Sequence, residues 1–214
     1  MKRLIALTFV WLLLFKPQSA FPADTGYPVK WIVDGDTIVL NDGRKIRYLG
    51  INAPELEHDG HRTEPFAVEA KQFNAALVDR KKVRLEFDGE RSDQYGRTLA
   101  YVFLRDGIFV NAEMLLHGYA FLLYHPQNRK YDSILLRSQR AAMSAKDGIW
   151  KNWQERPKAY VGNKQSRRFH LPACALGKRI KSQNRIVFQR QWDAFREGYA
   201  PAKGCLPEFK IPAE

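Results

Sequence analysis

Three short β-prone runs near the start of the chain restrict the folds that it can adopt. Residues 29–33, 37–40 and 44–51 are rich in Val, Ile and other residues that strands favour. The turn-forming stretches 34–35 (Asp-Gly) and 41–43 (Asn-Asp-Gly) separate them. This pattern predicts a meander of three strands joined by tight turns.

Three helical segments are predicted further along the chain. Apolar residues at helical spacing indicate helices over about residues 65–78, 111–122 and 129–146. Asn111 can cap the second helix, and Gly148 ends the third. The residues expected to face the core are Phe66, Ala70, Phe73 and Leu77 in the first helix, Met114, Leu115 and Ala120 in the second, and Ile134, Leu135, Ala141 and Ala142 in the third.

Two more strand-like runs, residues 83–87 and 98–104, complete the set of elements. Five strands with one inserted helix and two trailing helices suit a small closed barrel. The predicted fold class is therefore α+β, a five-stranded OB-fold β-barrel with three helices. Composition changes at Arg156-Pro157, so we expect residues 24–155 to form the barrel domain and residues 156–214 a small basic C-terminal module.

The N-terminal residues 1–23 read as a secretory signal peptide. Lys2 and Arg3 precede an apolar run over residues 4–15, and small residues follow. The run is shorter than the ~20 residues that a helix needs to cross a bilayer. We therefore expect a periplasmic or secreted protein that is not held by a membrane after cleavage. An uncleaved N-terminal anchor is the alternative.

The charge of the chain favours polyanionic partners. Lys and Arg number 35 against 23 Asp and Glu, which gives a formal net charge of +12 and a pI near 9.8. A basic surface raises the local concentration of nucleic acid. Many basic proteins nevertheless bind no nucleic acid, so charge alone does not assign a function.

Polar residues at the ends of the predicted strands form a candidate catalytic set. Asp36 and Asn52 offer oxygen atoms of the kind that hard cations bind. Arg47 and Arg97 can clamp the non-bridging oxygens of a phosphate, and Glu55 can take a proton from an attacking water. Each residue alone also has an ordinary explanation, as a turn-forming Asp or a solvated surface charge. The pattern by itself does not show that these residues converge in space.

Three blocks of sequence contain these residues. They read Val-Asp-Gly-Asp-Thr (33–37), Arg-Tyr-Leu-Gly-Ile-Asn-Ala-Pro-Glu (47–55) and Asp-Gln-Tyr-Gly-Arg-Thr-Leu-Ala-Tyr (93–101). In order and spacing they resemble the three signature blocks of the staphylococcal-nuclease (thermonuclease) family. The resemblance extends over about residues 27–153 and is specific because three blocks occur in register.

The resemblance implies an OB-fold barrel and an enzyme that uses Ca²⁺ to hydrolyse DNA and RNA. Such an endonuclease has little sequence specificity and leaves 3′-phosphate ends. By position in the blocks, the resemblance implies that Asp36, Asn52 and the Ala53 carbonyl bind the ion and that Glu55 is the general base. It implies that Arg47 and Arg97 bind the phosphate and that Tyr95 contacts a terminal phosphate. Outside the blocks, in a loop slightly shorter than that of the family, Tyr124 matches a tyrosine that contacts a nucleotide.

Asn52 departs from the family pattern, which has Asp at this position. An amide oxygen still binds calcium, but one negative charge is lost, so we expect weaker Ca²⁺ binding. The alternative function is therefore a catalytically weakened nuclease-like OB module that binds nucleic acid. Retention of Asp36, Arg47, Glu55 and Arg97 favours the enzyme. The sequence does not predict a long apolar helix that would need a partner chain to cover it. We therefore expect a monomer.

The C-terminal tail resembles the small zinc-binding module at the N-terminus of the bacterial alkyl-DNA repair protein Ada. His170, Cys174 and Cys205 match three of its four ligands, and Ala202 stands where a cysteine belongs. A structural zinc site needs four ligands, and exported proteins meet oxidising conditions. We therefore favour a Cys174–Cys205 disulfide, with zinc as the alternative. The stretch 58–61 (His-Asp-Gly-His) is expected to be a solvated loop rather than a metal site.

Overall fold

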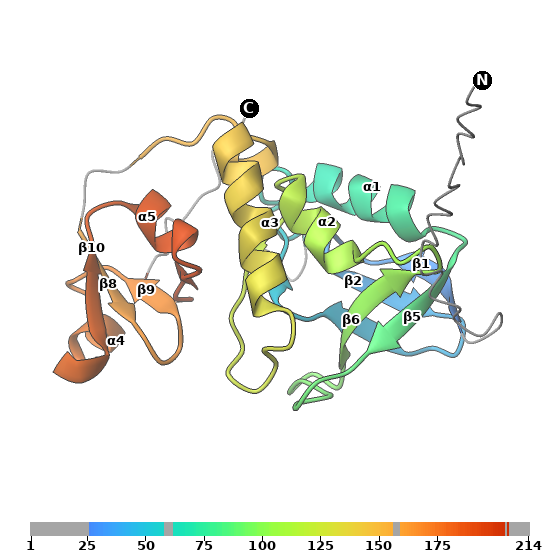
Figure 1. The fold of residues 1–214 in the computed structure, drawn as a ribbon, viewed down its shortest axis with the longest axis horizontal. Coiled ribbons are helices and arrows are strands. Elements are labelled where there is room, and N and C mark those ends of the chain that lie inside the picture. The colour runs from blue at the N-terminus through green and yellow to red at the C-terminus, as the bar shows by residue number, and fades with distance from the viewer. Residues whose placement is uncertain (1–25, 58–61, 156–158, 204, 206–214) are drawn as a thin grey trace, which may run out of the picture.

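The computed structural model describes residues 26–57, 62–155, 159–203 and 205. Five of the described strands close into a barrel in the order β1-β2-β3-β6-β5 (Figure 1). β3 and β6 run parallel, and the other neighbouring pairs are antiparallel. The predicted five-stranded barrel is confirmed. Its strands are β1 (Tyr27–Ile32), β2 (Thr37–Leu40), β3 (Lys45–Tyr48), β5 (Lys82–Glu86) and β6 (Thr98–Leu104).

Three helices cover one side of the barrel, as predicted. They are α1 (Ala67–Val78), α2 (Val110–Leu116) and α3 (Asp132–Ala145), with α2 lying between the other two (Figure 1). Most of the residues expected in the core are buried or half-buried, but Ile134 and Ala141 are exposed, so their predicted burial is wrong. The predicted burial of Leu135 and Ala142 is confirmed, and Gln139 and Met143 complete the buried stripe of α3.

Helix α2 ends at Leu116, which is earlier than the predicted end near residue 122. Gly118 turns the chain out of the helix with φ +67°, and a Cβ built at this glycine would lie 2.2 Å from the Asp147 carbonyl oxygen. Only glycine combines this backbone conformation with such a close approach. The chain then forms a short strand, β7 (Phe121–Leu122), which was not predicted.

Asn111 does not cap α2, so that prediction is wrong. The residue lies inside the helix and is fully buried. Its side-chain amide donates to the Leu49 carbonyl (2.8 Å), and its side-chain oxygen accepts from the Val102 amide (2.9 Å). Both partners belong to the barrel, so Asn111 joins the helix layer to the strands. Such a satisfied buried amide cannot be distinguished from a cap by local sequence.

The third predicted strand, residues 44–51, is split in two. β3 ends at Tyr48, and a two-residue strand, β4 (Ile51–Asn52), pairs with β7 instead. Gly50 makes the break with φ +77°, where an added Cβ would lie 2.4 Å from Leu135 Cδ1. Because of this break, Asn52 leaves the barrel wall and lies at the end of the barrel that also contains Asp36. This end of the barrel is called the rim below.

The C-terminal residues form a second, four-stranded sheet in the order β10-β8-β9-β11. β9 and β11 run parallel, whereas β8 is antiparallel to both β9 and β10. The sequence pattern predicted a small module here but no sheet. Its elements are β8 (Tyr160–Asn163), β9 (Arg168–His170), α4 (Ala175–Lys178), a 3₁₀ turn at Ser182–Asn184, β10 (Arg185–Phe188), α5 (Gln191–Arg196) and β11 (Ala200–Pro201). Another 3₁₀ turn, Gly148–Trp150, lies on the barrel side and follows α3.

A second apolar core joins this sheet to the barrel side. Trp150 and Phe121 from the barrel side and Phe169 and Phe195 from the sheet belong to one buried cluster. The Gln139 side chain also bridges the two parts, because it accepts from the Leu122 amide and donates to the Phe195 carbonyl, both at 2.6 Å. The C-terminal sheet is therefore packed firmly against α3 and β7.

Two predictions fall outside the part of the chain that the structure describes. These are the signal peptide over residues 1–23 and the loop containing His58 and His61. Within the described residues, none of the helices has the length and apolar character needed to span a bilayer.

Hydrogen bonds to Glu86 make the stability of the fold dependent on pH. Its carboxylate accepts hydrogen bonds from Arg84, from Lys130 Nζ (2.5 Å) and from Tyr131 Oη (2.7 Å), which links β5 to the segment before α3. Burial alone would raise the pKa of Glu86, but these donors outweigh burial and lower it to about 2. A lowered carboxylate pKa stabilises the fold above its ordinary value of 4.5, and that contribution is lost as the pH falls from there toward 2.

We predict that Glu86→Gln unfolds more easily than the wild type at pH 7, by about 1 kcal/mol, because solvent screens this half-buried cluster. The difference should shrink as the pH falls from 4.5 to 2.5, as measured by urea denaturation at each pH. Glu69→Gln, an exposed carboxylate on α1, is the control and should show little pH-dependent difference. A constant difference for Glu86→Gln at every pH would contradict the assigned cause.

Candidate active site

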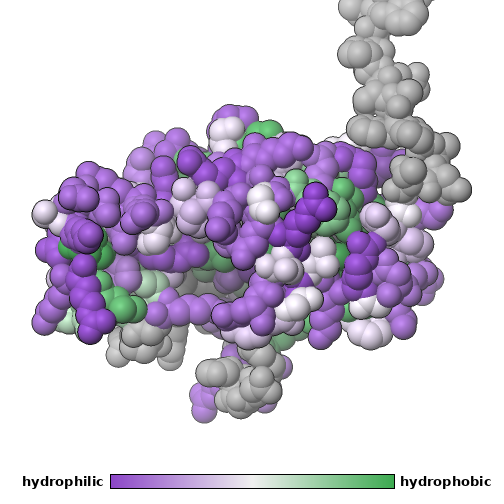
Figure 2. Space-filling model, turned by 90° about the horizontal axis from the view of Figure 1, so that it is seen from below, coloured by the Kyte–Doolittle hydropathy of each residue, from purple (hydrophilic) through white to green (hydrophobic). Residues whose placement is uncertain are grey.

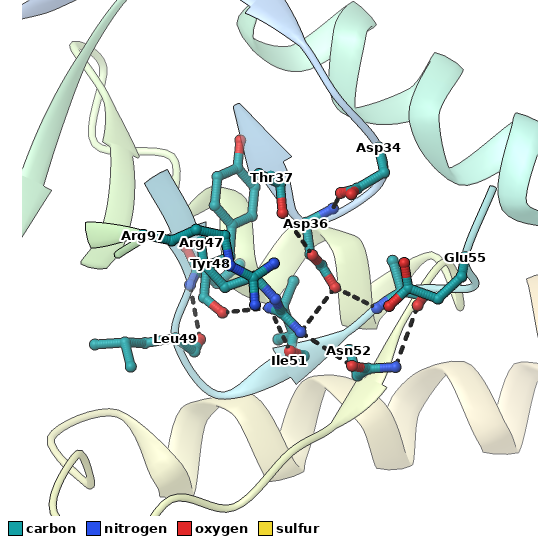
Figure 3. Close-up of polar contacts among 12 residues, drawn as sticks. Asp34, Asp36, Thr37, Arg47, Tyr48, Leu49, Ile51, Asn52, Glu55 and Arg97 are labelled. Carbon is teal, nitrogen blue, oxygen red and sulfur yellow. Dashed lines mark hydrogen bonds and ion pairs between the residues drawn. The ribbon is translucent and has the colours of Figure 1, made fainter. Parts of the chain in front are cut away.

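A buried ion pair lies at the centre of the candidate site. Arg47 Nη2 lies 3.0 Å from Asp36 Oδ2, and both side chains are less than a tenth exposed. Figure 3 shows this pair, and the same Asp36 oxygen accepts a hydrogen bond from the Ala53 amide (2.7 Å). Asp36 is held in the turn before β2, where its amide donates to Asp34 Oδ1 (2.8 Å). This turn type is typical of Asp and orients the carboxylate toward β3 and β4.

Arg47 also fixes the break between β3 and β4. Its Nη1 donates to the carbonyls of Tyr48 and Ile51, both at 2.8 Å, and its Nη2 donates to Asn52 Oδ1 (3.0 Å). One guanidinium therefore holds the carboxylate of Asp36 and the side chain of Asn52 on the same rim. The planar fork of arginine suits this arrangement, which a lysine could not reproduce.

Three carboxylates gather at this rim. Burial, and then the Asp36 charge, raises the pKa of Asp34 to about 7. Burial, and then Asp36, also raises the pKa of Glu55 above its ordinary value. The backbone of Glu55 is anchored by reciprocal contacts with Glu64, since each amide donates to an oxygen of the other residue at 2.9 Å. The rim thus concentrates negative charge. Asp34 was not among the predicted site residues, although it lies in the same turn motif as Asp36.

The donor atoms at the rim fit a hard divalent cation. The Asp36 carboxylate, the Asn52 side-chain oxygen and the Ala53 carbonyl are oxygen ligands of the kind that Ca²⁺ and Mg²⁺ take. The Asn52 amide nitrogen lies 3.2 Å from the Ala53 carbonyl oxygen, which places these two residues together. A cation would also offset the mutual repulsion of Asp34, Asp36 and Glu55.

Arg97 and Tyr95 lie on the loop that leads into β6. Because Thr98 pairs with Ile46 of β3, this loop reaches the rim beside Arg47, and Figure 3 shows Glu55 on the other side of Asp36. The Arg97 guanidinium binds Asp93 (Nε to Oδ2, 2.7 Å). Tyr95 is 75% exposed, and its ring centre lies 5.7 Å from the Arg97 guanidinium carbon. The structure thus places one arginine inside the acidic cluster and the second next to it.

Tyr124 lies further from this cluster, after β7 and against the C-terminal sheet. The guanidinium carbons of Arg129 and Arg167 each lie 5.5 Å from its ring centre. Its carbonyl accepts from Arg168 Nη2 at 3.4 Å. Another residue of the C-terminal part, Lys203, lies close enough to Glu55 to lower its pKa slightly against the effect of burial. No sequence pattern connects these C-terminal residues with the site, because contacts so distant along the chain leave no local signal.

The two cysteines meet at the end of the C-terminal sheet. The structure joins Cys174 and Cys205 in a disulfide with their Cα atoms 5.6 Å apart. His170 Nδ1 lies 3.1 Å from Cys205 Sγ, and the three candidate ligand atoms lie within 4.8 Å of one another. Burial lowers the pKa of His170, which favours the neutral imidazole. Ala202 is buried beside this cluster and donates its amide to the Phe169 carbonyl (3.0 Å).

Comparison with known proteins gives consistent matches. Residues 45–152 match the family described as "Staphylococcal nuclease homologue". The thermonuclease of Staphylococcus intermedius is 35% identical over 139 residues, which is 64% of this chain and 82% of the relative. The thermonuclease of Staphylococcus hyicus is 36% identical over 129 residues, 59% of this chain and 76% of the relative. Endonuclease YncB of Bacillus subtilis is 39% identical over 123 residues, 55% of this chain and 58% of the relative.

The different surroundings of the two arginines lead to a stability prediction. Arg47→Met should lower the free energy of unfolding by about 3 kcal/mol, because it leaves the buried Asp36 carboxylate without its counter-charge. Arg97→Met should cost about 1 kcal/mol or less, because its partner Asp93 is half-buried and close to solvent. Urea denaturation in the presence of EGTA measures both variants. Equal losses would contradict the central position given to Arg47.

Proposed function

This chain belongs to the staphylococcal nuclease family, and we propose that it is a calcium-dependent endonuclease that hydrolyses the phosphodiester bonds of DNA and RNA. The observation that carries the proposal is the rim itself. A buried carboxylate–guanidinium pair, oxygen donors for a hard cation and a carboxylate of raised pKa lie together at the open end of an OB-type barrel. The names of the similar proteins, thermonuclease and endonuclease, support the same activity.

In this proposal Asp36, Asn52 and the Ala53 carbonyl hold the Ca²⁺ ion. When bound, the ion supplies positive charge that polarises the phosphate and stabilises the charge that develops on it. Arg47 remains on Asp36 and Asn52, so it keeps these donors in position. The calcium assignment rests on the all-oxygen donor set and on the family resemblance.

The remaining chemistry belongs to the side chains. Glu55 takes a proton from the attacking water, and its raised pKa makes it a better base near neutral pH. Arg97 binds the non-bridging oxygens of the phosphate as the water adds to phosphorus. Arg47 contributes its Nε–H, because its Nη1 and Nη2 stay on the two carbonyls, Asp36 and Asn52. The bond from phosphorus to the 5′ oxygen then breaks, that oxygen takes a proton from solvent water, and Glu55 returns its proton to the solvent. The products are a 3′-phosphate and a 5′-hydroxyl. Tyr95 is exposed beside Arg97 and is proposed to contact a terminal phosphate.

We further propose that the protein is exported to the periplasm or beyond the cell and acts as a monomer with little sequence preference. Export is supported by the N-terminal sequence pattern, and broad activity on nucleic acid by the excess of Lys and Arg over Asp and Glu. We also propose that the chain consists of a signal peptide (residues 1–23), a barrel domain (24–155) and a C-terminal module (156–214). The separate C-terminal sheet supports the boundary between the last two.

The second candidate function is a binding module of the same fold that has lost catalysis. Asn52 favours this alternative, because a neutral amide replaces a family carboxylate at a proposed calcium ligand. The two functions differ in one respect that experiment can resolve, which is whether bound nucleic acid is cut.

We predict that the protein, without residues 1–23, digests DNA in Ca²⁺ and stops in excess EGTA. Glu55→Gln should lower kcat by about a hundredfold or more, the usual contribution of a general base, while DNA binding is retained. Glu57→Gln, an exposed neighbour, should keep wild-type activity. Tight DNA binding without cutting in any divalent cation would contradict the proposal and favour the binding module.

We predict that Asn52→Asp binds Ca²⁺ more tightly than the wild type, by roughly tenfold, because it restores a negative charge among the ligands. Calorimetric titration of both proteins with Ca²⁺ measures this change. Asn41→Asp, which alters an exposed amide at the opposite end of β2 from Asp36, serves as a control and should not tighten binding. Equal or weaker affinity in Asn52→Asp would contradict the role given to Asn52.

A further inference from the structure

The C-terminal sheet carries a large excess of positive charge. Between residues 159 and 203 there are ten Lys and Arg but two acidic residues, Asp193 and Glu197. Asp193 pairs with Arg190 (2.7 Å), and Glu197 lies 3.5 Å from Arg140 of α3. Most of the positive charge of the sheet is therefore not neutralised by its own carboxylates. In Figure 2 hydrophilic residues extend over both the C-terminal part and the barrel.

Some of this charge converges on Tyr124, at the boundary between the sheet and the barrel. Arg167 and Arg168 reach the ring and the carbonyl of Tyr124 from β9 and the turn before it, and Arg129 reaches the ring from the loop before α3. Asp132, paired with Arg129 at 3.3 Å, is the carboxylate that faces this group. Two guanidinium groups thus lie over one aromatic ring and a third donates to the backbone carbonyl of the same residue, which combines a stacking surface with donors for phosphate.

Arg168 is poorly satisfied within the part of the chain that is described. Its Nη1 is buried and has no hydrogen-bond partner there, and its Nη2 makes only the long contact to Tyr124. Burial lowers its pKa. A half-buried guanidinium without a carboxylate is unfavourable by itself, so an anion held beside Tyr124 would stabilise it.

Lys203 brings positive charge close to Glu55. The segment that carries it is fixed on both sides, because the Ala200 and Ala202 amides donate to carbonyls of the β9 region at 3.0 Å and Cys205 is bonded to Cys174. Lys203 is exposed, and its charge acts on Glu55. The shared core around Trp150 and Phe195 makes this arrangement rigid rather than dependent on a mobile tail.

We propose that the C-terminal sheet is a second half of the nucleic-acid-binding surface, in which Arg167 and Arg168 bind a backbone phosphate beside Tyr124 and Lys203 binds one beside Glu55. This inference rests on the proposed function for the identity of the polyanion. The strand bound at the barrel rim continues onto the sheet, so the sheet increases affinity for long nucleic acid without taking part in bond cleavage.

The test measures binding of a fluorescent single-stranded DNA of about 20 nucleotides in excess EGTA, where no turnover occurs. Arg167→Gln/Arg168→Gln should raise the Kd about tenfold, and the slope of log Kd against log salt should fall by about 1.4, because two phosphate contacts are lost. The matched control, Lys178→Gln/Arg179→Gln, removes one charge from the end of α4 and one from the residue after it, far from α3 (Figure 1). It should leave the slope unchanged and the Kd within about twofold.

Equal losses of affinity in the two double variants would overturn the inference, because only net charge would then matter. Circular dichroism shows whether the double arginine variant folds. If it does not, the DNA affinities of Lys203→Gln and Lys178→Gln are compared instead. Lys203→Gln should weaken binding about threefold and lower the slope by about 0.7, and identical binding of the two lysine variants would overturn the inference. If the wild-type protein binds this DNA but does not cut it in Ca²⁺, the proposed nuclease activity is contradicted, whereas the proposed binding surface is not.

Discussion

Asp36 and Arg47 meet at 3.0 Å beneath the rim of the barrel, almost completely withdrawn from water. Burying two charges costs several kcal/mol of desolvation, and their attraction often does no more than repay it. The role of this ion pair is therefore to position the surrounding groups rather than to stabilise the folded protein. The Asp36 carboxylate binds the Ala53 amide, and the Arg47 guanidinium holds Asn52 and the carbonyls around the β3–β4 break. Every proposed metal donor is thus placed by this one contact.

The second constraint is the apolar core that joins the C-terminal sheet to the barrel. Asn52 of β4 pairs with Phe121 of β7, and the Phe121 ring packs edge-on against Phe195 at 5.7 Å. The rim of the site is therefore connected to the sheet through one strand pair and one aromatic contact. The sheet is a fixed neighbour of the site, and its positive charge is held at a defined place beside Tyr124 and Glu55.

Local patterns in the sequence were sufficient to predict the barrel, and the structure brings three residues of the predicted set, Asp36, Arg47 and Asn52, into contact. Runs of β-prone residues between turns indicated the strands, and the family resemblance of the three blocks assigned Asp36, Arg47 and Glu55 to one site. Contacts over long sequence distances could not be predicted in this way. Asn111 was taken for a helix cap because its real partners, Leu49 and Val102, lie far away along the chain. The strands of the C-terminal sheet have four residues or fewer, too short to show a period. The nearness of Lys203 to Glu55 likewise depends on how the sheet packs, which no local pattern encodes.

The most direct measurement is the anomalous scattering from crystals grown with Ca²⁺. The arrangement of donors predicts a calcium peak among the oxygens of Asp36, Asn52 and Ala53, and its loss in Asp36→Ala. No peak at the rim in crystals of active protein would contradict the central claim, and so would a peak elsewhere in the molecule. In either case, the buried ion pair would organise the barrel without building a metal site.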